Sequence, residues 1–145
     1  MGKFLSTTLF LGLAALLAVA SDAAVDLKST DLGWSKACEA KNLDQFMSFV
    51  GDDVYASGPD GKWTHGKAAM RDGWSKMLAD PGFKLSWVAD TAGVSKDGHF
   101  GYTRGTLQGS LGGKPVSGSY ATVWEKAKDG KWRVTVDIAS VAAQP

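Results

Sequence analysis

The sequence has few of the residues that metal and redox sites need. Its 145 residues include one cysteine, Cys38, and two histidines, His65 and His99. A lone cysteine has no partner for an intramolecular disulfide, and we interpret Cys38 as a small buried hydrophobic residue on a helix rather than as a reactive thiol. No spacing of histidine, cysteine and carboxylate residues predicts a metal site, and no glycine motif predicts a nucleotide cofactor. We therefore expect no metal and no cofactor.

An excess of charge of either sign is also missing. The chain has 16 Lys and Arg against 15 Asp and Glu, with a formal net charge of +1. It contains no basic stripe and no run of like charges, which argues against nucleic acid and against an anionic membrane surface as partners. Removal of Lys3 with the N-terminal segment would leave 15 basic against 15 acidic residues, so the mature domain is expected to be near neutral.

What the sequence does contain at its start is a long apolar run. Lys3 is followed by apolar residues that end in an Ala-Val-Ala tripeptide at Ala20. A short positive region, an apolar stretch and small residues predict a secretory signal peptide over residues 1–20, cleaved before Ser21 or alternatively before Ala24. An uncleaved membrane anchor is disfavoured because the run is short for a full span. We expect a periplasmic or secreted protein with no stable membrane insertion after cleavage.

The remaining chain is rich enough in apolar residues, at 44% of the whole sequence, to form one domain with its own core. Apolar residues first recur at helical spacing, and Asn42 is suited to cap the second helix. Helices are expected over residues 25–40, 43–50 and 66–78. A short strand over 54–57 and a turn over 58–61 precede the third helix.

After Gly82 the apolar period changes to two, which predicts an antiparallel sheet. We expect four strands, which include residues 83–87, 100–106, 119–126 and 132–140. In the last of these, Trp132, Val134, Val136 and Ile138 would share one face, opposite Arg133, Thr135, Asp137 and Ala139. Since helices can cover only one face of the sheet, we expect a homodimer through the outer sheet face; the alternative is an outer face left as exposed apolar surface.

Several segments resemble a known superfamily. The order of elements is similar to the cone-shaped fold of nuclear transport factor 2, ketosteroid isomerase and SnoaL-like cyclases. The segments GHFGYTRG at 98–105, GSYATVWEK at 118–126 and DGKWRV at 129–134 look like the domain-of-unknown-function 4440 branch of that superfamily. The resemblance implies one α+β domain over residues 26–142, with three N-terminal helices packed on a curved, mostly antiparallel sheet and a pocket at its wide end.

The resemblance also allows a test for one known chemistry. Ketosteroid isomerases use a tyrosine on the first helix, an aspartate base on the first strand and a protonated aspartate on a later strand. Aligned by eye, these positions are Trp34, Gly58 and Thr122 here. Because indole is a weak substitute for an acidic phenol and neither other residue titrates usefully, that mechanism is disfavoured.

The candidate site residues are polar and aromatic side chains on the sheet and the first helix. Asp137 is the one catalytic candidate, as a general base, and Arg104 and Tyr102 are expected to lie beside it on the inward face. A buried Asp137–Arg104 ion pair without a ligand is the structural alternative. The full set of expected ligand-binding residues is Trp34, Tyr55, Ser57, Tyr102, Arg104, Tyr120, Thr122, Trp124 and Asp137.

Three functions remain open at this point. The leading hypothesis is an exported small-molecule-binding protein with a mainly apolar pocket for a small apolar or aromatic ligand. The first alternative is an isomerase, cyclase or dehydratase that uses Asp137 as its general base. The second is a non-catalytic dimeric interaction domain whose pocket is filled by its own side chains.

Overall fold

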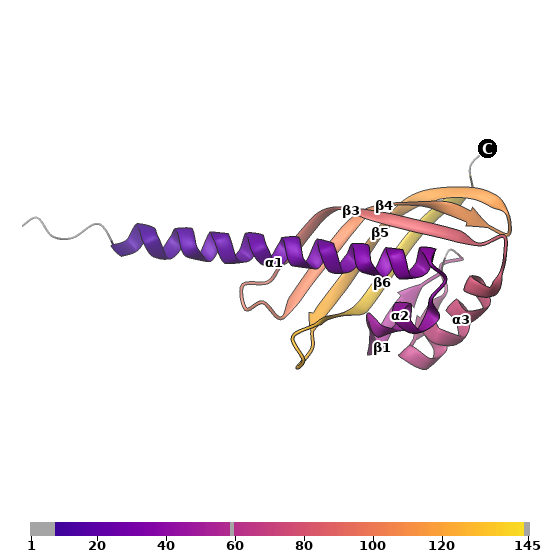
Figure 1. Cartoon of the computed structure of the whole chain (residues 1–145), viewed down its shortest axis with the longest axis horizontal. Coiled ribbons are helices and arrows are strands. Elements are labelled where there is room, and N and C mark those ends of the chain that lie inside the picture. The colour runs from indigo at the N-terminus through magenta and orange to yellow at the C-terminus, as the bar shows by residue number, and fades with distance from the viewer. Residues whose placement is uncertain (1–7, 59, 144–145) are drawn as a thin grey trace, which may run out of the picture.

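The computed structural model describes residues 8–58 and 60–143, and three helices pack on the concave side of a curved sheet (Figure 1). The helices are α1 (Thr8–Glu39), α2 (Leu43–Ser48) and α3 (Lys67–Ala79). Residues 1–7 of the expected signal peptide and Pro59 of the expected turn lie outside the described residues. Asn42 caps α2 as expected, since its side chain accepts a hydrogen bond from the backbone N–H of Gln45 at 3.0 Å.

The sheet has six strands in the order β2-β1-β6-β5-β4-β3. The strands are β1 (Val50–Ser57), β2 (Trp63–His65), β3 (Lys84–Val94), β4 (Phe100–Leu111), β5 (Lys114–Lys126) and β6 (Trp132–Ala143). All neighbours are antiparallel except β1 and β6, which are parallel. The predicted α+β class is therefore confirmed. Val50, which the sequence pattern placed in the second helix, is instead the buried first residue of β1, because an apolar residue at that spacing can be buried in either conformation.

Helix α1 is longer than the sequence pattern predicts and extends well beyond the sheet at its N-terminal end (Figure 1). Its buried stripe starts at Leu27 and continues through Asp31, Trp34 and Cys38. These residues follow the spacing i, i+4, i+7 and i+11, which places them on one helix face against the sheet. No helix in the described part of the chain is long and apolar enough to cross a membrane.

The core is a cluster of aromatic rings centred on Trp34 of α1. Its ring lies 5.0 Å from Trp87, 5.1 Å from Phe46 and 5.6 Å from Trp124, measured between centroids. Edge-to-face and tilted arrangements of this kind stabilise a core beyond simple burial. Cys38 is buried beside them as predicted, and burial raises the pKa of its thiol to about 12, so the thiol is unreactive near neutral pH.

A β-bulge in β6 decides which residues face the helices. On β5, Trp124 pairs with Val134 and Val123 with Val136, so Thr135 is an extra residue without a partner. An extra residue reverses the alternation of side chains along a strand. Trp132 and Val134 are therefore buried on the inner face, Asp137 is half-buried on the same face and lines the cavity, and Ile138 is exposed. The expectation that Trp132, Val134, Val136 and Ile138 share one face was wrong.

Candidate functional site

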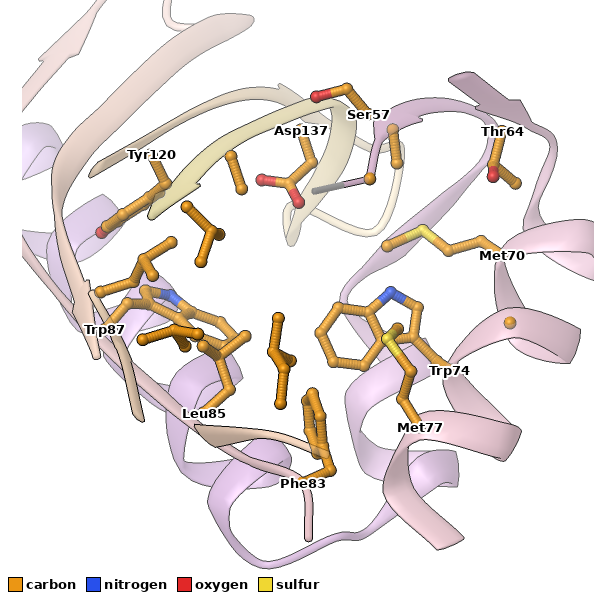
Figure 2. A pocket seen from close by; sticks show the side chains of 18 of the residues that line it. Ser57, Thr64, Met70, Trp74, Met77, Phe83, Leu85, Trp87, Tyr120 and Asp137 are labelled. Carbon is orange, nitrogen blue, oxygen red and sulfur yellow. The ribbon is translucent and has the colours of Figure 1, made fainter. Parts of the chain in front are cut away.

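A cavity of about 150 Å³ lies between α3 and the inner face of the sheet (Figure 2). Trp74 and Met77 of α3 form one wall, and Leu85 and Trp87 of β3 form another. The wall is mostly apolar. Among the described residues that line it, Asp137 and Tyr120 are the ones with titratable side chains. The cavity therefore offers an apolar space with one acidic group, Asp137, in its wall.

Asp137 reaches the cavity from β6, beyond the bulge. The hydroxyl of Thr122, its neighbour on β5, donates a hydrogen bond to Asp137 Oδ1 at 2.8 Å. Figure 2 shows the carboxylate directed into the space between Tyr120 and Met70. Burial raises the pKa of Asp137 to about 6; the hydrogen bond from Thr122 opposes this rise and the charge of Asp31 adds to it. The carboxyl group can therefore hold or release a proton near neutral pH.

A second acid, Asp31 of α1, is fully buried and is linked to the cavity wall through Tyr120. The hydroxyl of Tyr120 donates to Asp31 Oδ2 at 2.6 Å, and the hydroxyl of Thr103 donates to Oδ1 at 3.1 Å. Trp124 extends this network, since its indole N–H donates to Thr103 Oγ1 at 2.9 Å. Burial raises the pKa of Asp31, although these hydrogen bonds oppose the rise.

The hydrogen bonds around Asp31 occupy the polar atoms of Tyr120 and Trp124, two residues that the sequence analysis assigned to a ligand. The Tyr120 hydroxyl is directed to Asp31, and both burial and that acid raise its pKa, so its ring rather than its hydroxyl lines the cavity. Sequence reasoning missed Asp31. A signal was present, because a carboxylate that falls on a helix stripe between Leu27 and Trp34 must be buried with them.

Some of the expected ligand-binding residues do come together. Trp34, Ser57, Tyr120 and Asp137 line the cavity. Thr122 is buried and acts through its bond to Asp137. Ser57 lines the edge of the cavity, but Figure 2 shows its hydroxyl turned away from the centre.

Other expected residues lie elsewhere. Arg104 and Tyr102 are on the outer face of β4, where the buried residue between them is Thr103. Tyr102 is 46% exposed, and Arg104 is 3.8 Å from Asp90, an exposed acid of β3. The expected position of both beside Asp137 was wrong. The inner face of β4 carries small residues: Gly101 leaves room for Leu27 of α1, and Thr103 and Gly105 follow it, so the larger side chains that alternate with them face outward.

Tyr55 and Trp124 are also outside the cavity. Tyr55 is 44% exposed and stacks on His65 of β2, with ring centroids 4.1 Å apart. Trp124 is completely buried in the core, where Thr103 satisfies its indole N–H. Neither residue therefore contributes a surface to a ligand in this cavity.

The three positions aligned with the ketosteroid isomerase residues lie around the cavity. Trp34 and Gly58 line it, and Thr122 contacts Asp137. None of the three carries an acidic group, so that mechanism has no base at its usual position. Within the described residues, no group of three or more His, Cys, Asp or Glu side chains could hold a metal ion.

The family model for the SnoaL-like domain matches residues 33–135. The chain belongs to the SnoaL-like domain family. This match covers most of the residues that line the cavity and the sheet as far as the bulge in β6, and it ends before Asp137. No curated protein sequence matches the chain.

Solved structures share the fold of this SnoaL-like domain at low sequence identity. An NTF2-like protein of unknown function from Pseudomonas putida has a TM-score of 0.70 at 13% identity, over 83% of this chain and 87% of that one. A ketosteroid isomerase-like protein from Erwinia carotovora atroseptica has a TM-score of 0.67 at 17% identity, over 89% and 97%. An LEH-like epoxide hydrolase from M. tuberculosis has a TM-score of 0.58 at 18% identity, over 85% and 84%. The expected superfamily fold is thus confirmed, and these similarities show the fold alone.

Proposed function

We propose that this SnoaL-like domain is an exported small-molecule-binding protein whose cavity holds a small apolar or aromatic ligand. One observation carries the proposal: Asp137 presents a carboxylate, anchored at one oxygen by Thr122, to a cavity whose other walls are mostly apolar. A polar group that is positioned but not fully bonded, within an apolar enclosure, is typical of a ligand site.

The size of the cavity supports a ligand of one ring or two small rings. Its volume of about 150 Å³ is similar to that of an engineered apolar cavity in another protein that binds benzene. An interaction domain filled by its own side chains would have no such space. The cavity therefore favours ligand binding over that alternative.

Ligand-dependent stabilisation tests the proposal. A compound present at about 100 times its Kd raises the free energy of unfolding by about 2.7 kcal/mol, which increases Tm by several degrees in a domain of this size. We expect such an increase for one-ring compounds in wild type and a smaller one in Asp137→Ala. Asp90→Ala, which removes an acid from the outer face, is the matched control. If a compound raises Tm equally in wild type and in both variants, Asp137 does not contact the ligand.

Export is supported by the position of α1 relative to the sheet. Cleavage before Ser21 or before Ala24 would remove the part of the helix that extends beyond the domain and leave the buried stripe from Leu27 onward intact. Intact-mass measurement of the protein from the periplasm and from the medium tests this. A mass of the uncleaved chain in the cell membrane fraction would contradict it.

A general-base enzyme is the second candidate function. The observation that favours it is again Asp137, since a base with a pKa of about 6 suits proton abstraction near neutral pH. The reaction class would be isomerisation, cyclisation or dehydration of a carbonyl compound. A pH–rate profile with a carboxylate pKa in wild type that disappears in Asp137→Asn supports this function, and the absence of turnover across a carbonyl panel contradicts it.

Homodimerisation through the outer sheet face is part of the proposal. Val88, Tyr102, Val123 and Ile138 all lie exposed on that face, on four different strands. Their strands are adjacent in the sheet, and Tyr102 pairs directly with Val123. Exposed apolar side chains on one sheet face are suited to pack against the same face of a second copy of the chain.

Within the family, we propose the domain-of-unknown-function 4440 branch. The segments at residues 98–105, 118–126 and 129–134 support it. In the structure these segments form the start of β4, most of β5 and the turn into β6. A search with a model built from that branch alone, scored against the SnoaL-like model, tests the assignment.

A further inference from the structure

We propose that the cavity selects small amines with an apolar body, bound as cations that donate a hydrogen bond to Asp137, and that it rejects carboxylates. This inference rests on the proposed binding function and specifies the class of ligand. It is carried by the charge of the wall, by the free oxygen of Asp137 and by the rings opposite it.

The charge of the wall has one sign. Among the described residues that line the cavity there is no lysine, arginine or histidine, and Asp137 is the one acid. Arg104, which the sequence placed beside Asp137, lies on the opposite face of the sheet near Asp90. A ligand carboxylate would therefore approach a second carboxylate without any cation to balance the two charges.

The hydrogen bonds of Asp137 leave room for a donor. Thr122 occupies Oδ1, and in the described chain no hydrogen bond reaches Oδ2. An ionised carboxylate only accepts hydrogen bonds, so the ligand must supply the N–H or O–H group. A charged donor makes a stronger bond to a carboxylate than a neutral donor does.

The wall across from Asp137 suits a cation attached to a ring. Figure 2 shows Trp74 and Phe83 on the far side of the space from Asp137. Their rings can stack on the ligand body and can also attract a positive charge through their faces. The indole N–H groups of Trp34 and Trp87 are neutral donors; a ligand carboxylate that accepted a hydrogen bond from them would still leave two negative charges, its own and that of Asp137, without a cation.

Asp137 also makes the expected affinity depend on pH. The groups that face it are Thr122 on β5, Ala56 on β1, and Met70 and Trp74 on α3; Asp31 on α1 acts on it through its charge. None of the four facing groups titrates. The ionisable side chains that interact with Asp137 through their charge are Asp31 and Tyr120 on β5. Because burial raises the pKa of Asp137 to about 6, acidification below that value neutralises the carboxylate while an alkylamine stays protonated.

Four one-ring probes separate this inference from the general binding proposal. Benzylamine, benzyl alcohol, toluene and benzoate are titrated into the exported protein at pH 7.5, with tryptophan fluorescence as the signal. We expect benzylamine to bind roughly 10- to 100-fold more tightly than toluene, and benzoate more weakly than toluene. In Asp137→Asn the advantage of benzylamine over benzyl alcohol should disappear, and Asp90→Asn should leave the order unchanged.

The outcomes distinguish the two levels of the argument. If toluene binds as tightly as benzylamine, or benzoate binds more tightly than either, the amine preference is overturned and the apolar binding site stands. If none of the four binds, the binding function of this cavity is overturned as well. Should Asp137→Asn fail to fold, wild type alone decides: benzylamine affinity must fall between pH 7.5 and pH 5, and a constant affinity overturns the inference.

Discussion

Thr122 and Asp137 face each other on adjacent strands, and the threonine hydroxyl donates to Asp137 Oδ1 at 2.8 Å. This bond stabilises the ionised carboxyl group and so limits the rise of its pKa. Thr122→Val keeps the shape and removes the donor, so we expect the pKa of Asp137 to rise further above about 6. Carbon-detected NMR titration of the carboxyl group measures it. Thr106→Val, on the outer face, is the control, and an unchanged pKa in Thr122→Val would contradict the role of the bond.

Asp137 should make the fold less stable as the pH rises. Its pKa is raised by folding, so the folded state holds the proton more tightly than the unfolded state, and the stabilisation is complete below pH 3.8 and lost as the pH rises to about 6. The difference between these two values corresponds to a loss on the order of 3 kcal/mol. Urea unfolding of wild type and Asp137→Asn from pH 3.5 to 7.5 checks this. The stability of the variant relative to wild type should increase with pH across that window, and parallel curves would contradict the burial of the charge.

The buried network at Asp31 should matter for stability more than for ligand affinity. Asp31→Ala leaves the hydroxyl of Tyr120 without its acceptor, and we expect a loss of about 2–4 kcal/mol. Tyr120→Phe, which keeps the ring in the cavity wall, should cost about 1–3 kcal/mol. Chemical denaturation measures both losses. Toluene affinity should change little in Tyr120→Phe; a large loss of affinity there would mean that the hydroxyl serves the ligand.

The outer sheet face predicts the effect of a charge on assembly. Val123 is exposed at the middle of that face, between Tyr102 on β4 and Val136 on β6. Val123→Glu would place an unpaired charge inside the proposed dimer, so we expect it to convert the dimer to a folded monomer. Light scattering after size-exclusion chromatography measures the mass. Trp63→Glu, at an exposed residue of β2, should remain dimeric, and a wild type that is already monomeric at tens of micromolar, as a rough working concentration, would contradict the proposed dimer.

Much of the fold could be predicted from the sequence because its patterns are long and consistent. The change of period after Gly82 and the turn glycines define the antiparallel sheet, and Leu43, Phe46 and Met47 define the second helix. The three-residue strand β2 could not be predicted, since it owes its place to pairing with β1 rather than to a pattern of its own.

The candidate site was predictable only in part. Asp137 was recognised because an acid within an apolar strand is unusual, whereas Arg104 and Tyr102 were placed on the wrong face. The face of β4 depends on which side the helices cover, and the face of β6 depends on the bulge at Thr135. Both are tertiary properties that period-two alternation does not contain.

The bulge at Thr135 fixes which side chains line the cavity through strand register. If the same residues were paired without a bulge, alternation from Val134 would turn Ile138 inward and send Asp137 to the opposite surface. Deletion of Thr135 itself would remove the bulge and leave Asp137 opposite Thr122, so the acid would stay on the inner face. A one-residue slip of this strand, with no change of side chain, therefore separates a cavity wall with an acid from one with an isoleucine in its place.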